Sequence, residues 1–205
     1  MKNALDLPIL LKEMAPEMGY VFSKGDLAHL FGNRDNTTLD ARMRKMIRSG
    51  YLKRAMRGYF YSEGAALEDL ALKIYPEGYL SLGTALCYHQ MIGTSPRWLC
   101  HMMTTRPKGK VIKTDIGTIS MSCHQAEQHF GIINVNGRRY ANKEKALIDT
   151  CYFYLRGKKF PFNINSDIDI SSLDQERLEE YLSCYKNSKF ISFVRGLIKN
   201  YGRST

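Results

Sequence analysis

The chain has 205 residues and a net charge of +10, from 30 Lys and Arg against 20 Asp and Glu. Its length suits one large domain or two small ones, and a composition that is 44% hydrophobic and 24% charged excludes a mainly disordered protein. No stretch is long and apolar enough for a transmembrane helix, the first residues do not resemble a signal peptide, and the five cysteines form no CxxC pair. We therefore expect a cytoplasmic protein with reduced thiols and an anionic partner, nucleic acid first.

The hydrophobic spacing of residues 1–62 predicts three helices followed by a β-hairpin, the plan of a winged helix-turn-helix. Helices are expected at residues 5–14, 24–31 and 39–49, a short extended run at 19–22, and hairpin strands at 51–54 and 58–61. Ser23 and Asp26 match a capping box at the start of the second helix. Thr37 or Thr38 is expected to cap the third helix, and Gly50 to end it.

Much of the positive charge lies on the predicted third helix and hairpin. Residues 37–58 contain seven basic side chains and one acidic one, Asp40, and so carry more than half of the net charge. A charged helix face is usually only solvated, but here a second basic cluster follows on the adjacent hairpin. This combination is typical of a surface that binds nucleic acid.

Binding to double-stranded DNA assigns roles to these residues, because a helix enters the major groove and flanking cations contact phosphates. The residues expected to face bases are Thr38, Asp40, Ala41, Arg42 and Lys45. Those expected to contact phosphates are Arg44, Arg48, Lys53, Arg54 and Arg57. One such domain reads few base pairs, so a dimer or cooperative binding on an inverted repeat is expected.

Residues 63–205 have the pattern of a separate α+β domain, with the boundary expected near residues 62–66. Asn136-Gly137 predicts a tight hairpin because these residues suit a type I′ turn. Caps are expected from Ser81, from Asn142, and from Ser172 with Gln175 in a capping box. The expected helices are 65–75, 82–91, 143–155, 173–184 and 189–201, and the expected strands are 98–104, 110–114, 118–123, 132–135 and 138–141.

The segments YLSLGTAL at 79–86 and ANKEKALID at 141–149, together with the predicted wing at 50–61, resemble motifs of the AbiEi antitoxins of abortive-infection toxin–antitoxin systems. The segment at 79–86, YLSLGTAL, is similar to the family's opening helix, with Thr84 where serine is usual. The segment at 141–149, ANKEKALID, is similar to a second family motif, with Lys143 where proline is usual. Further similarity lies at 50–61, 103–106, 117–119 and 130–131, so the matches extend over about residues 20–155.

The resemblance implies a bacterial antitoxin and transcriptional autorepressor that acts in phage defence. It would bind inverted repeats in its own promoter through domain 1–62, and domain 63–205 would counteract a co-encoded nucleotidyltransferase toxin, in some systems without stable contact. Exposed cations at predicted strand exits and turns are our candidates for the antitoxin surface, although ordinary solvated turns would look the same. They are Arg106, Lys108, Lys110, Arg138 and Arg139.

Other functions find less support in the sequence. Cys100-His101 and Cys123-His124 lack the spacing of a zinc site, and no local motif marks a nucleophilic cysteine. Asp115, Glu127 and Lys145 would have to converge for a metal-dependent nuclease. We expect no enzyme, no metal and no cofactor. The alternatives left open are a stand-alone winged-helix regulator with a ligand-sensing or dimerising second domain, and a DNA-processing nuclease.

Overall fold

The computed structural model describes residues 7–32, 35–94, 96–105 and 111–201. The described residues form eight α-helices, two short 3₁₀ helices and two β-sheets, so the predicted α+β class is confirmed. Within them, no helix is both long and apolar enough to cross a membrane. Two compact units are present: one is Met1–Pro76 with Ile112–Thr118, and the other is Glu77–Val111 with Ile119–Thr205.

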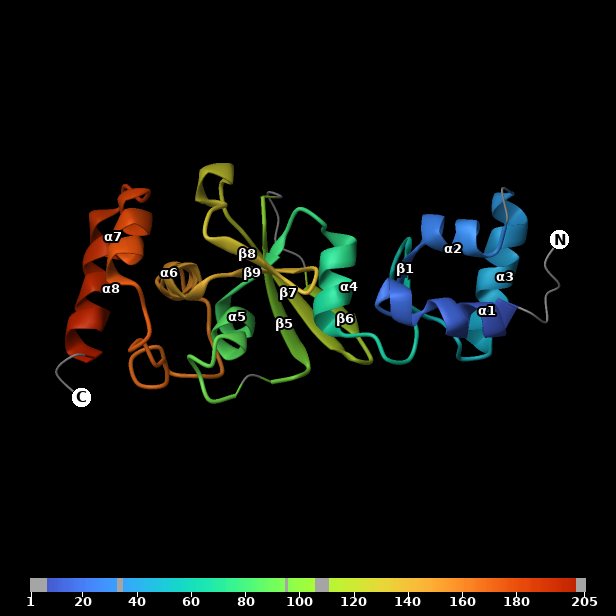
Figure 1. The fold of residues 1–205 in the computed structure, drawn as a ribbon, viewed down its shortest axis with the longest axis horizontal. Coiled ribbons are helices and arrows are strands. Elements are labelled where there is room, and N and C mark those ends of the chain that lie inside the picture. The colour runs from blue at the N-terminus through green and yellow to red at the C-terminus, as the bar shows by residue number, and fades with distance from the viewer. Residues whose placement is uncertain (1–6, 33–34, 95, 106–110, 202–205) are drawn as a thin grey trace. The chain divides into compact units, whose positions relative to one another are not determined.

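The first unit contains helices (Figure 1) and a three-stranded antiparallel sheet with the strand order β1-β3-β2. Its elements are α1 (Leu7–Met14), a 3₁₀ turn (Pro16–Met18), β1 (Val21–Ser23), α2 (Lys24–Leu30), α3 (Asn36–Arg48), β2 (Lys53–Met56), β3 (Tyr59–Tyr61) and α4 (Leu67–Ile74). The helices close over one apolar core, which includes Leu7, Leu11, Phe22, Leu27, Phe31, Leu39, Met43, Met46, Leu52 and Phe60.

Local signals in the sequence explain two helix ends of this unit, the start of α2 and the end of α3. The capping box of Ser23 and Asp26 is present, with the Asp26 amide donating to the Ser23 hydroxyl at 3.1 Å and the Ser23 amide to the Asp26 carboxylate at 2.7 Å. Gly50 follows α3 with φ of +77°, as expected of a glycine that ends a helix. The expected cap of α3 is wrong, because Asp35 accepts from the amides of Thr37 and Thr38 and the helix begins one turn earlier.

The first unit extends past the boundary expected near residue 62. Helix α4 packs against β1, and the chain leaves this unit only after Pro76. Residues 112–118, which the sequence analysis placed in the second domain, belong to the first unit as well. There Asp115 forms an ion pair with Lys53, which is a long-range contact that local sequence patterns do not reveal.

The chain after Pro76 is built on a mixed sheet with the strand order β6-β7-β5-β4-β9-β8. Residues 112–118, in β6 and at the start of β7, belong to the first unit, and the other strands of this sheet belong to the second. The elements of this part of the chain are β4 (Tyr79–Leu80), α5 (Leu82–Tyr88), β5 (Leu99–Thr104), β6 (Val111–Thr114), β7 (Gly117–Cys123), a 3₁₀ turn (Ala126–Gln128), β8 (Ile132–Val135), β9 (Arg138–Ala141), α6 (Lys143–Tyr154), α7 (Gln175–Ser183) and α8 (Ser188–Tyr201). The short central strand β4 runs parallel to β9 and antiparallel to β5. The expected hairpin is confirmed, with positive φ at Asn136 and Gly137 between β8 and β9.

Helix α6 is the centre of the second unit. It packs against α5 and β9 and also against α7 and α8 (Figure 1). All residues from Glu144 to Cys151 are therefore buried, polar ones included. Asn142 caps this helix as expected, by accepting from the Lys145 amide at 2.9 Å. The expected capping box at Ser172 is wrong, since Asp174 caps α7 through the Arg177 amide.

Candidate functional site

The exposed face of α3 carries cations because the opposite face holds the core. Leu39, Met43 and Met46 are buried at helical spacing, which directs the intervening side chains to solvent. The exposed cations on this helix are Arg44, Lys45 and Arg48. Thr38, which was expected to face bases, lies in the exposed first turn of the same helix, and Ala41 is exposed one turn further on.

The β2–β3 hairpin adds two more exposed cations beside this helix. Arg54 lies on β2 with its guanidinium 5.5 Å from the centre of the Phe60 ring, and Arg57 occupies the turn next to Gly58. Two surface hollows lie between α3 and the hairpin, and Arg44 and Arg54 line both. The larger has a volume of about 680 Å³ and is also lined by Ala41, Ile47 and Arg48.

Three of the residues expected to contact DNA already have partners within the protein. The Arg42 guanidinium is half-buried and donates to the Phe31 carbonyl oxygen at 3.0 Å, at the end of α2. Asp40 forms an ion pair with Lys24 at 2.7 Å, and Lys53 pairs with Asp115. Arg44, Lys45, Arg48, Arg54 and Arg57 have no acidic partner within the described part of the chain.

The cations proposed from the sequence as an antitoxin surface are not brought together as one described cluster. Arg106, Lys108 and Lys110 lie outside the described residues. Arg138 and Arg139 are half-buried on β9. The Arg139 guanidinium donates twice to the Gly78 carbonyl oxygen, at 3.0 and 2.5 Å, so its charge stabilises the start of β4.

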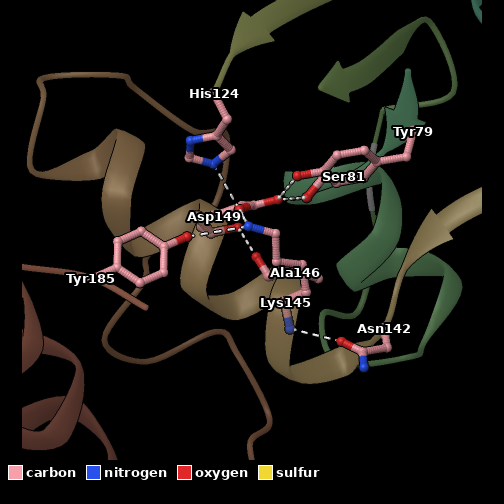
Figure 2. Close-up of polar contacts among 9 residues, drawn as sticks. Tyr79, Ser81, His124, Asn142, Lys145, Ala146, Asp149 and Tyr185 are labelled. Atoms are coloured by element: carbon pink, nitrogen blue, oxygen red, sulfur yellow. Dashed lines mark hydrogen bonds and ion pairs between the residues drawn. The ribbon is translucent and has the colours of Figure 1, made fainter. Parts of the chain in front are cut away.

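A polar cluster lies in the interior of the second unit, centred on Asp149 of α6. One carboxylate oxygen of Asp149 is 2.7 Å from the Lys145 ammonium and 2.8 Å from His124 Nε2. The other accepts from the hydroxyls of Ser81 at 2.7 Å and Tyr79 at 3.1 Å. Figure 2 shows these side chains converging on Asp149 from separate segments of the chain. The Ser81 hydroxyl therefore binds Asp149 and does not cap α5, as the sequence had led us to expect.

Neighbouring groups keep the Asp149 carboxylate ionised. Burial alone would raise the pKa of Asp149, but the Lys145 ammonium and the hydrogen bond from His124 lower it to about 2. Lys145 is also held by the Tyr185 hydroxyl at 3.2 Å and lies 4.4 Å from the centre of the Phe130 ring. Burial and the nearby Asp149 charge raise the pKa of Tyr79, so that its hydroxyl keeps its proton.

The cluster contains serine, histidine, lysine and aspartate, the residue types of a hydrolase, but it is closed to substrate. Ser81, Lys145 and Asp149 are 0% exposed and His124 is 4% exposed. The serine donates to the aspartate rather than to the histidine, and the low pKa of that carboxylate makes it too weak a base to activate the serine. Such a network stabilises β4, α6 and the loop at Tyr185 relative to one another.

Of the residues considered for metal or thiol chemistry, His124 and Lys145 belong to this cluster, whereas Asp115 pairs with Lys53. Among the described residues, no group of three His, Cys, Asp or Glu side chains could hold a metal ion. The five cysteines are free thiols, as predicted. Burial raises the pKa of the Cys151 thiol to about 12, which removes its nucleophilic character at neutral pH.

Comparisons with known proteins bear on the fold. No family model matches the chain, and no curated protein matches it. The chain is similar to the crystal structure of the RV2827C protein from Mycobacterium tuberculosis, with a TM-score of 0.63 and 15% sequence identity over 93% of this chain and 75% of the other. At that identity the likeness extends to the fold alone.

Proposed function

We propose that the chain is a DNA-binding antitoxin that represses its own promoter, and that its first unit is a winged helix-turn-helix. One observation carries the DNA-binding part: five exposed cations without acidic partners lie on α3 and on the hairpin beside it. In this proposal α3 is the recognition helix and β2–β3 is the wing. Charge of this kind supplies much of the affinity for double-stranded DNA.

The contacts inside the first unit refine the roles proposed for individual residues. Thr38, Ala41 and Lys45 remain candidates to face bases, since they are exposed on α3. Arg42 acts as a positioning residue, because its bond to Phe31 ties α3 to the end of α2. The Lys24–Asp40 pair lines one of the two hollows and orients the acidic side chain near the hairpin.

The antitoxin part rests on the resemblance of the sequence motifs to the AbiEi family. The partner would be a co-encoded nucleotidyltransferase toxin, counteracted with or without stable contact, and both proteins would act in the cytoplasm. In this proposal the second unit carries the antitoxin role, whereas the first unit binds DNA through the cations of α3 and the hairpin. No catalytic step is assigned to the chain.

DNA binding is tested by fluorescence anisotropy with a fragment of the chain's own promoter over a range of salt concentrations. Because each phosphate contact contributes about 0.9 to the slope of log K against log salt, Arg54→Ala with Arg57→Ala should lower that slope by about 1.8. Lys186→Ala with Lys189→Ala removes the same charge from exposed positions in the second unit and is the matched control. Equal slopes for the two double variants would refute the proposed interface.

The geometry of the operator gives a second readout of the same proposal. Two copies on an inverted repeat should protect half-sites about 34–36 Å apart, or a multiple of that distance. Footprinting that shows one short site without cooperativity would contradict this arrangement.

The antitoxin role is tested by growth of cells that express the product of the adjacent gene, with and without this chain. Rescue by the wild type and also by a variant that lacks the cations of α3 would support separate functions for the two units. Absence of any rescue, together with intact promoter binding, would instead favour a stand-alone regulator.

A further inference from the structure

A second concentration of hydrogen-bond donors lies in the second unit, around the ammonium of Lys158 just after α6. Its Nζ donates to Ser122 Oγ at 3.0 Å and to Ser120 Oγ at 3.2 Å. Both serines are on β7, and because alternate residues of a strand share a face, their hydroxyls point to the same side of the sheet. Ser122 is buried, whereas Ser120 and Lys158 are half-buried and open to solute.

The Lys158 ammonium has no acidic partner among the residues that the structure describes. Burial lowers the pKa of this group. A partly buried cation that is paired only with neutral hydroxyls is poorly compensated. Lysine offers three N–H donors, of which two are used here, and each serine that accepts from Lys158 keeps its own proton to donate. Three donors are thus available next to an uncompensated positive charge.

The segment that carries Lys158 is held in place by close packing. Phe160 and Phe162 stack with their ring centres 5.2 Å apart, and Phe160 also contacts the His101 ring at 6.1 Å. Phe162 lies so close to α5 that a Cβ added at Gly83 would be 3.1 Å from its ring. The ammonium therefore projects from a packed segment.

His101 of β5 completes the surroundings. Its side chain is 3% exposed, and its Nδ1 has no hydrogen-bond partner. Burial and the Lys158 charge lower the pKa of His101 to about 3, so the ring is neutral. His101 therefore brings no charge of its own to the ammonium, and its Nδ1 lies beside Gly83 of α5.

We propose that Lys158, Ser120 and Ser122 form a binding site for a phosphate group, either as inorganic phosphate or on a nucleotide. The oxygens of a phosphate would accept from the third ammonium N–H and from both serine hydroxyls. The charge of the anion would compensate Lys158, and charge-assisted hydrogen bonds of this kind are the strong ones in proteins. This site goes beyond the proposed DNA-binding and antitoxin functions and does not depend on either.

The test is isothermal titration calorimetry of the full-length protein with sodium phosphate, with AMP and with adenosine, at constant ionic strength. Lys158→Met keeps most of the side-chain volume and should weaken binding by about 10- to 100-fold, as expected for loss of a hydrogen bond to a charged group. Lys159→Met is the matched control, since Lys159 is an exposed neighbour, and it should bind like the wild type. Ser120→Ala with Ser122→Ala removes the hydroxyls while the ammonium stays.

The titrations distinguish inorganic phosphate from a nucleotide, and both from an adventitious ion bound elsewhere on the protein. Tighter binding of AMP than of phosphate indicates a nucleotide, and binding of phosphate alone indicates the free anion. Absence of binding by the wild type at about 10 mM ligand would overturn the proposal. Binding that both the Lys158→Met and the double serine variant retain would also overturn it, because the anion would then lie elsewhere on the basic surface.

Discussion

Replacement of Lys145 by methionine tests the polar centre of the second unit most directly. The change removes an ammonium that lies 2.7 Å from the Asp149 carboxylate, while the side chain keeps a similar volume. Asp149 would keep its bonds from Ser81, Tyr79 and His124 but lose the one lysine charge beside it.

The expected magnitude follows from the burial of both partners. Loss of one member of a buried ion pair costs about 3–5 kcal/mol, because the other charge is left uncompensated. The lowered pKa of Asp149 has the same direction, since the Lys145 ammonium favours the ionised carboxylate against the effect of burial. Since a domain is stable by only about 5–15 kcal/mol, the variant should be marginally stable.

The pKa of Asp149 determines how the stability difference between the variant and the wild type should change with pH. In the wild type the folded pKa of Asp149 lies below its usual value of 3.8, so this carboxylate stabilises the fold above that pH and ceases to do so as the pH falls toward 2. In Lys145→Met, burial without the ammonium raises the pKa of Asp149. The variant should therefore differ most from the wild type at neutral pH, and the difference should shrink as the pH falls and the carboxyl takes up a proton.

The assay is urea unfolding followed by circular dichroism at pH 7 and at pH 5. Lys143→Met is the control, because Lys143 lies on the same helix but donates to Ser172 at the surface. This substitution should change the free energy of unfolding by less than about 0.5 kcal/mol. A loss below about 1 kcal/mol for Lys145→Met at pH 7, or a deficit that grows toward pH 5, would refute this reasoning.

Five further substitutions have defined outcomes in the same unfolding assay and, for Lys45→Ala, in DNA binding as well. Gly131→Ala should destabilise the fold by more than about 2 kcal/mol, since φ is +65° and the new Cβ would lie 2.8–2.9 Å from side chains of α6 and α7. Gly157→Ala is the control, because φ is +84° there but the space is open, and it should cost about 1 kcal/mol. Asn142→Ala removes the cap of α6 and should cost about 1–2 kcal/mol, and no change would contradict the capping role. Arg42→Ala should lower stability by about 1.5 kcal/mol, whereas Lys45→Ala should weaken DNA binding at unchanged stability.

The sequence predicted elements well where the signal was local. The capping box at Ser23, the cap at Asn142 and the hairpin at Asn136-Gly137 are confirmed, because each depends on residues within a few positions of one another. The α+β class followed from the same patterns. Errors occurred where several candidate side chains were adjacent: Asp35 rather than a threonine caps α3, and the carboxylate accepts from two amides at once.

Tertiary contacts account for what the sequence did not predict. The Ser81 hydroxyl was expected to cap α5, but it binds a carboxylate 68 positions later. Asp149 was expected to form hydrogen bonds to other elements and does so, but the burial of Lys145 beside it was not predicted, because it depends on the elements that cover α6 on both sides. Among the expected DNA contacts, Arg42 and Lys53 have partners at sequence separations of 11 and 62, which no local pattern encodes.

The burial of residues in the motifs that resemble the AbiEi family limits how the proposed antitoxin role can be tested. Tyr79, Ser81, Leu147 and Asp149 all belong to those motifs, and each is 0% exposed. Side chains without exposed surface do not touch a partner, so they can affect a toxin only through the fold that they stabilise. Loss of growth rescue in a variant of these residues would therefore have the same appearance as unfolding. A toxin contact, if one exists, has to be sought among exposed side chains, with the stability of every variant measured alongside the growth of the cells.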